Sequence, residues 1–174
     1  MNLLKVFLLL ASCVVLGGCA SSYVAPSSAS SARLRIAVPQ SETFASVGVR
    51  AYPSGRCESP MTLGMIGGIG KLHHEQSIGI PGSSEFASGT SIERLIHSGS
   101  PYMVSMRGLY SAKVCTITFR FTPVRGQDYE AIYSWGGGDC YVTLRQVSGS
   151  PTGKITRRKV SGSEQTDKCG KGFS

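Results

Sequence analysis

The clearest pattern in the sequence is an alternation of apolar and polar residues, which is typical of half-buried β-strands. The alternation is strongest at residues 112–121, where one face carries Cys115, Ile117, Phe119 and Phe121. The same pattern predicts strands at 33–38, 45–52, 128–135 and 140–147, and two further strands between 91 and 106. A last strand is expected over 154–160, followed by a polar tail to Ser174.

Segments rich in Gly, Pro and Ser separate these strands and predict turns, as at Pro53-Ser54-Gly55 and Gly136–Asp139. Residues 59–90 are rich in glycine and show no sustained periodicity, so we expect a long loop there with at most one short strand. The strands at 112–121, 128–135 and 140–147 follow one another through short turns. They therefore predict an antiparallel meander.

Seven or eight short strands indicate an all-β fold, a small antiparallel β-sandwich of immunoglobulin-like or transthyretin-like type. A small closed barrel is the alternative. The composition agrees, because 22 glycines in 174 residues would destabilise a helical bundle.

The N-terminal residues 1–18 form an export signal, with Lys5 before an apolar run that is shorter than a membrane span. The sequence Leu16-Gly17-Gly18-Cys19 resembles the lipobox of bacterial lipoproteins. This resemblance implies cleavage before Cys19 and its modification by diacylglycerol and a further acyl chain such as palmitate. Because no aspartate follows Cys19, it also implies the outer membrane, with the periplasmic or surface face left open. The alternative is an ordinary secretory signal with a chance cysteine.

Three parts follow from this pattern: the signal peptide 1–18, the lipidated Cys19 with a flexible Ser/Ala/Pro tether to residue 32, and a β-sandwich domain over 33–174.

Four cysteines remain after cleavage and lipidation, which in an exported chain predicts two disulfides. They are Cys57, Cys115, Cys140 and Cys169. In a meander Cys115 and Cys140 would flank a middle strand, too far apart to be bridged. We therefore expect Cys140–Cys169 and Cys57–Cys115. Zinc binding is disfavoured, because the sequence has no Cys-x-x-Cys pair.

About half of the exported chain resembles a family of uncharacterised proteobacterial outer-membrane lipoproteins. The resemblance lies in Arg50–Cys57, Leu63–Met65, Cys115–Phe121, Gly126–Glu130, Trp135 and Cys140–Val142. It implies a location and a β-rich fold, and it implies no activity.

Motifs for catalysis are weak throughout. The glycine-rich stretch Gly64–Lys71 lacks the spacing of a phosphate loop, and it fits a flexible loop or a contact with lipid or a partner. His73, His74 and His97 do not form a zinc motif. The acidic residues give no obvious glycosidase pair, and we expect the carboxylates of Asp128 and Glu130 to stabilise a turn. We expect no enzyme activity, no metal and no cofactor.

The C-terminal region is basic. Lys154, Arg157, Arg158 and Lys159 could bind anionic lipid or wall polymer, with Lys168 and Lys171 behind them. The alternative is a solvated edge whose charges prevent strand pairing. Nucleic acid is an implausible partner for an exported lipoprotein.

These observations predict an outer-membrane lipoprotein that acts as a non-enzymatic binding or scaffolding module of the cell envelope. The alternatives are an inhibitor or immunity protein against a wall-degrading enzyme or toxin, and a lipoprotein of a secretion machine.

Overall fold

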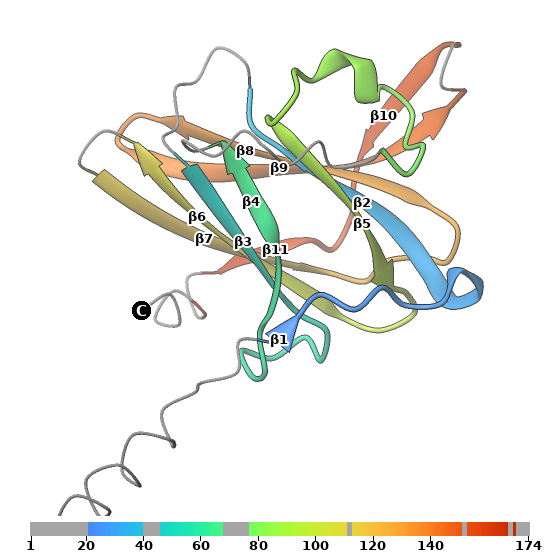
Figure 1. Cartoon of the computed structure of the whole chain (residues 1–174), viewed down its shortest axis with the longest axis horizontal. Helices are drawn as coiled ribbons and strands as arrows, with labels where there is room; N and C mark the ends of the chain where they lie inside the picture. The colour runs from blue at the N-terminus through green and yellow to red at the C-terminus, as the bar shows by residue number, and fades with distance from the viewer. Residues whose placement is uncertain are drawn as a thin grey trace, which may run out of the picture.

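The computed structural model describes residues 21–39, 46–67, 77–110, 113–150, 153–166 and 169. Its ribbon is built almost wholly from strands that pack as two layers (Figure 1). The strands are β1 (Ser21–Ser22), β2 (Ser31–Ala37), β3 (Ser46–Tyr52), β4 (Met61–Gly67), β5 (Ser91–His97), β6 (Tyr102–Tyr110), β7 (Lys113–Phe121), β8 (Asp128–Gly136), β9 (Asp139–Gly149), β10 (Ile155–Lys159) and β11 (Glu164–Thr166). Two short 3-10 turns, η1 (Ser28–Ser30) and η2 (Ser83–Glu85), lie between them.

Sheet A has the strand order β1-β4-β3-β6-β7-β11, and sheet B has the order β10-β9-β8-β2-β5. Most neighbours are antiparallel, but β1 pairs with β4 and β2 pairs with β8 in parallel. The fold is therefore the expected disulfide-stabilised β-sandwich, with two parallel pairings that the sequence pattern did not predict.

The hydrophobic core lies between the inner faces of the two sheets. The alternation of side chains along each strand sends every second residue into this core. On sheet A it includes Val47, Val104 and Phe119, and on sheet B it includes Leu34 and Tyr133. Since such large side chains are almost fully removed from water, their burial supplies the main stabilisation of the fold.

The predicted strands are confirmed, with shifts of a few residues at their ends. The expected loop at 59–90 contains β4 and the turn η2. The polar tail contains the short strand β11, which pairs with β7.

The prediction of a flexible tether at 20–32 is wrong from residue 21 onward. Ser21 and Ser22 pair with Met61 and Thr62 at the edge of sheet A. The hydroxyl of Tyr23 donates a hydrogen bond to the Leu95 carbonyl of sheet B, 2.9 Å away. A Ser/Ala/Pro composition did not reveal these contacts because they are made mostly by backbone groups and by one aromatic ring.

The predicted disulfide pairing is also wrong. The bridges are Cys57–Cys169 and Cys115–Cys140, with Cα atoms 5.3 and 6.0 Å apart respectively. We had treated β7, β8 and β9 as one meander, but β7 belongs to sheet A while β8 and β9 belong to sheet B. The connection 122–127 crosses between the sheets, so Cys115 faces Cys140 across the core. The spacing of alternate strands in one sheet therefore does not apply to this pair.

Candidate interaction surface

The outer face of sheet B is closed by a buried ionic cluster. Arg35 on β2 has no exposed surface. Its guanidinium donates to Glu93 at 2.8 and 3.0 Å and to Glu130 at 3.0 Å. It also donates to the carbonyls of Ile80 and Pro81, at 2.7 and 3.0 Å. Every N–H of a buried guanidinium needs such a partner, so this arginine holds the segment before η2 onto the sheet.

Two neighbouring arginines extend the cluster. Arg33 makes a two-pronged contact with Asp128, at 2.6 and 2.7 Å. Arg157 on β10 donates to Glu130 at 3.0 Å and to Glu85 at 2.6 Å. We expected Asp128 and Glu130 to stabilise a turn, and that prediction is wrong: both carboxylates accept from arginines of the adjacent strand β2, and Glu130 also accepts from Arg157 on β10. Paired charges therefore cover the part of this face around Arg35.

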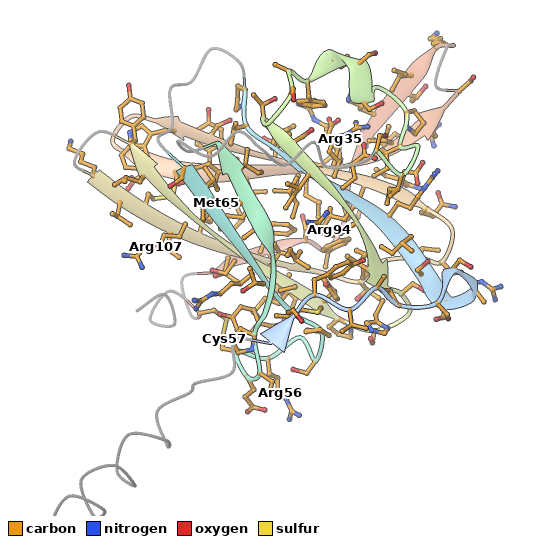
Figure 2. All side chains as sticks on the ribbon, in the orientation of Figure 1. Arg35, Arg56, Cys57, Met65, Arg94 and Arg107 are labelled. Carbon is orange, nitrogen blue, oxygen red and sulfur yellow. A yellow bond between two sulfur atoms is a disulfide. The ribbon has the colours of Figure 1, made fainter. Side chains whose placement is uncertain are left out.

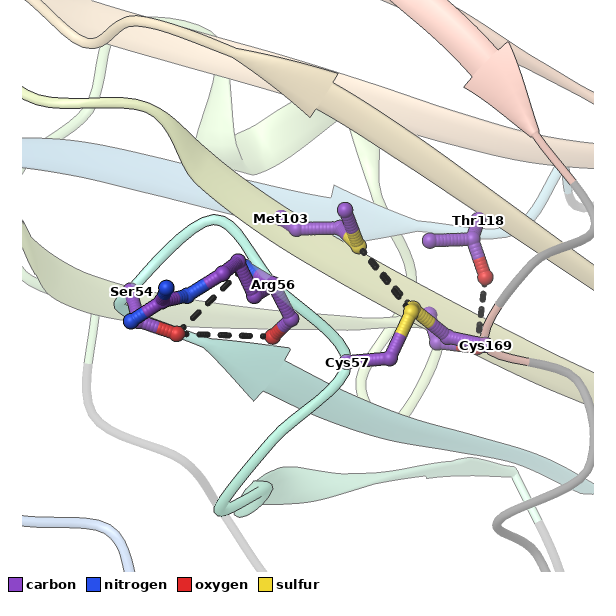
Figure 3. Close-up of a disulfide and its surroundings, with 7 residues drawn as sticks. Ser54, Arg56, Cys57, Met103, Thr118 and Cys169 are labelled. Carbon is purple, nitrogen blue, oxygen red and sulfur yellow. Dashed lines mark hydrogen bonds between the residues drawn. A yellow bond between two sulfur atoms is a disulfide. The ribbon is translucent and has the colours of Figure 1, made fainter.

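The outer face of sheet A is covered near the Cys57–Cys169 bridge. Figure 3 shows the bridge over β6, where the Met103 sulfur lies 3.0 Å from the sulfur of Cys169. Tyr52, Met103 and Cys169 form a small separate hydrophobic cluster. Cys169 thus covers the part of this face around Tyr52 and Met103.

The other half of that face exposes apolar side chains. Register places Met65, Gly48 and Arg107 side by side on β4, β3 and β6. Leu109 and Val114 face each other in the next row, on β6 and β7. Met65 is 63% exposed and Val114 is 50% exposed. Figure 2 shows Met65 on β4 and the side chain of Arg107 directed away from the sheet.

The same end of the sandwich is closed by aromatic residues and a disulfide. Tyr110 from sheet A stacks on Trp135 from sheet B, with ring centroids 5.6 Å apart. The Cys115–Cys140 bridge joins the sheets beside this pair, because Cys140 lies opposite Trp135 in the register. Tyr141 follows on β9 and is exposed.

Exposed large hydrophobic residues are not scattered over the part of the chain that the structure describes. There are seven, and five lie at or near this end. We call these five the distal surface: Met65, Leu109 and Val114 on the outer face of sheet A, Tyr110 against Trp135, and Tyr141 on the outer face of sheet B. The remaining two, Val24 and Val124, lie toward the opposite end. Because the five come from four strands in two sheets, no single stretch of sequence could reveal the surface. The sequence did contain one indication of this surface: the alternation in β6, β7 and β9 leaves some apolar residues at outward positions.

The predicted basic residues are divided by the structure. Arg157 is engaged in the ionic cluster, whereas Lys154, Arg158 and Lys159 are exposed. Lys159 lies opposite the exposed Arg145 in the β9–β10 register. Lys168 and Lys171 lie outside the described residues.

Most of the remaining candidate residues lie outside the part of the chain that the structure describes. His97 is exposed at the end of β5, and His73, His74 and Lys71 lie outside the described residues, as does Cys19. Across the described ranges, no three His, Cys, Asp or Glu residues are grouped so that they could hold a metal ion. In those ranges no helix is long and apolar enough to cross a membrane.

The fold and the surface together define an all-β, disulfide-bonded sandwich with a buried ionic cluster on sheet B and exposed apolar residues at one end. No known protein family, curated protein or solved structure matches the chain.

Proposed function

We propose that this protein is an outer-membrane lipoprotein, anchored through Cys19, whose distal surface binds another protein of the cell envelope without catalysing a reaction. The observation that carries the proposal is the group of exposed apolar residues at the distal end, of which Met65, Leu109 and Val114 share the outer face of sheet A. Contiguous apolar patches on a soluble domain mark interaction sites.

The chemistry of the distal surface fits a protein partner. Aromatic residues and methionine are enriched in the buried centres of protein interfaces. The distal surface holds two tyrosines and a methionine, and the stacked Trp135 lies beneath Tyr110. Tyrosine and tryptophan rings give large contact areas at low conformational entropy cost.

Two basic residues lie beside these apolar residues. Lys113 is exposed in the same hairpin, and Arg107 lies one row away from Leu109. With a net charge of +8 for the whole sequence, the protein favours a partner with an acidic rim. This charge preference disfavours an inhibitor of basic wall-degrading enzymes, and it leaves scaffolding in an envelope assembly as the preferred role.

Site-specific photo-crosslinking in intact cells tests the binding surface. A photoreactive amino acid at Leu109 or Tyr141 should give one prominent crosslinked envelope protein, and Val114→Glu in the same chain should abolish that product. The matched control is Thr156, which is exposed on β10 and away from the distal surface. Equal crosslinking from Thr156, or none from the distal positions, would refute the proposal.

Membrane fractionation tests the anchor separately. Because the thiol of Cys19 is the proposed acylation site, Cys19→Ala should move the protein from the membrane pellet to the soluble fraction. The control is Cys13→Ala, which changes a cysteine of the proposed signal peptide and should leave the pellet unchanged. Retention of the Cys19 variant in the pellet would contradict the anchor.

A second candidate function is anion binding at β10, favoured by the Arg145–Lys159 pair. Like charges directly opposite on neighbouring strands are destabilising, and an anionic ligand would relieve that repulsion. Binding to vesicles containing phosphatidylglycerol should fall with added salt and in the double variant Arg145→Ser, Lys159→Ser. Binding that is unchanged in the double variant would argue against this site.

A further inference from the structure

The N-terminal segment is fastened to both sheets, which fixes where the chain enters the sandwich. β1 pairs with the first residues of β4 in sheet A. Tyr23 donates to the Leu95 carbonyl in sheet B, and the Arg94 guanidinium lies over its ring at 5.3 Å. The position of residue 21 is therefore set by the fold.

Only Ala20 separates Cys19 from Ser21, so the covalent chain between them spans about 7 Å at full extension. Acyl chains on Cys19 would enter the hydrocarbon layer directly below that residue. β1 must then lie within the thickness of the headgroup region, because the chain is too short to reach farther.

β1 lies toward one end of the sandwich, where several loops meet (Figure 1). The backbone N–H of Gly126 donates to the Ser31 carbonyl, and that of Gly99 donates to the Pro123 carbonyl. We call this surface the proximal end and define it by the loops 23–30, 53–60, 98–101 and 122–127. It is opposite the distal surface, because Met61 pairs with Ala51 whereas Leu109 pairs with Ser46, at the other end of β3.

The proximal end carries the chemistry of a membrane-interface surface. Val24 is 72% exposed and Val124 is 58% exposed, each in a loop that can enter the headgroup layer. Arg125 is exposed beside Val124, and Arg56 is exposed in the loop 53–60, where it is only loosely paired with Glu58 at 3.8 Å. Arginine near an anionic bilayer binds lipid phosphates, and its apolar stem can follow adjacent valines into the interface.

We propose that the proximal end rests on the bilayer, with Val24 and Val124 at headgroup level and Arg56 and Arg125 on lipid phosphates. This proposal rests on the lipid anchor proposed above. The distal surface then points away from the membrane. It lies about 30 Å from the bilayer surface, which is the length of a nine-residue strand.

Tryptophan fluorescence can test this orientation, because the sequence contains one tryptophan, Trp135, at the distal end. The acylated protein is reconstituted into phosphatidylethanolamine/phosphatidylglycerol vesicles whose acyl chains carry bromine, a quencher of tryptophan. In a Trp135→Phe background, Val124→Trp and Val24→Trp report on the proximal end. Tyr141→Trp is the matched distal control, and all three positions are exposed.

Vesicle flotation is measured on the same samples, so that the lipid anchor and the orientation of the domain are tested independently. We expect the variants to float and the two proximal tryptophans to lose at least half of their fluorescence, with less than a tenth lost at position 141. If the protein floats and no position is quenched, the domain stands off the bilayer and the orientation is refuted while the anchor holds. Quenching at 141 alone would also refute it. If the acylated preparation does not float, the anchor itself fails, and the orientation falls with it.

Discussion

The two ends of the sandwich expose apolar residues in different ways. At the distal end they stand on strands, and the Cys115–Cys140 bridge and the Tyr110–Trp135 stack hold the two sheets together beneath them. At the proximal end Val24 and Val124 stand on loops that are joined by backbone hydrogen bonds. Recognition of a protein partner benefits from a preorganised surface, whereas contact with fluid lipid does not require a fixed shape. The difference therefore supports a division of roles between the ends.

The two disulfides provide the largest test of this comparison. In the chain-entropy account, loss of Cys57–Cys169, which closes a loop of 112 residues, lowers the free energy of unfolding by about 4.8 kcal/mol. Loss of Cys115–Cys140, which closes 25 residues, lowers it by about 3.5 kcal/mol. Urea unfolding of the two Cys→Ser double variants measures both.

Those variants should also differ in function. The Cys115→Ser, Cys140→Ser protein should lose distal crosslinking under conditions where it is still folded, because the base of the surface is loosened. Its proximal contact with vesicles should be unchanged. Equal loss at both ends would contradict separate roles.

Removal of the buried arginine should affect both ends alike. Arg35→Ala leaves the buried Glu93 without its arginine and Glu130 with Arg157 as its remaining ion-pair partner, and we expect a loss of about 3 kcal/mol in unfolding free energy. Arg33→Ala is the matched control: it removes a more exposed guanidinium from Asp128 and should cost about 1 kcal/mol. Thermal unfolding followed by circular dichroism compares the two, and similar losses would argue against a special role of the buried cluster.

A smaller change can loosen the distal end alone. A Cβ atom at Gly108 would lie 2.5 Å from the Tyr133 hydroxyl, which donates to the Cys115 carbonyl at 3.0 Å. Gly108→Ala should therefore cost about 2 kcal/mol through overpacking. The expected readouts are a lower unfolding midpoint and altered Trp135 fluorescence in the folded protein. An unchanged midpoint would show that Tyr133 can move without loss.

The smallest expected effect is at Tyr102, in the core near the proximal end. Its buried hydroxyl has no hydrogen-bond partner among the described residues, so Tyr102→Phe should be neutral or stabilising by about 1 kcal/mol. Burial, helped by the nearby Tyr23 phenol, raises the pKa of Tyr102 above its ordinary value of 10.0.

The raised pKa of Tyr102 makes the unfolding free energy depend on pH in a definite direction. The folded state holds the phenol proton of Tyr102 more tightly than the unfolded state does. The resulting contribution to stability is complete below pH 10, and it is lost as the pH rises above the unfolded-state pKa. Unfolding measured between pH 8 and pH 11 should therefore show a shallower decline for Tyr102→Phe. Parallel curves would rule out Tyr102 as a source of the decline.

Some of the fold could be predicted because strand alternation is local. The apolar face of β7 was assigned from its own residues, and Phe119 and Phe121 are buried as that pattern requires. β4 was harder to predict, because Gly64 and Gly67 interrupt its apolar face and its pairing with β3 shifts register after Val49.

The candidate site could not be predicted in the same way. Arg35 and Glu130 lie in different parts of the sequence and meet only through the parallel β2–β8 pairing. Arg33 and Arg35 alternate with the core residues Leu34 and Ile36, so they lie on the face away from the core. It did not show that residues 77–81 cover Arg35, which changes an apparently solvated face into a buried one.

By itself, the sequence determined the all-β class, the approximate strands and the residues of each that enter the core. These follow from the two-residue period of an extended chain and the free energy of removing apolar side chains from water. Tertiary structure alone decided which cysteines pair, which charges are buried and where exposed hydrophobic residues gather. Those outcomes depend on which sheet each strand joins, because a connection such as 122–127 can either turn back within one sheet or cross to the other. The packing of the whole sandwich selects between these alternatives.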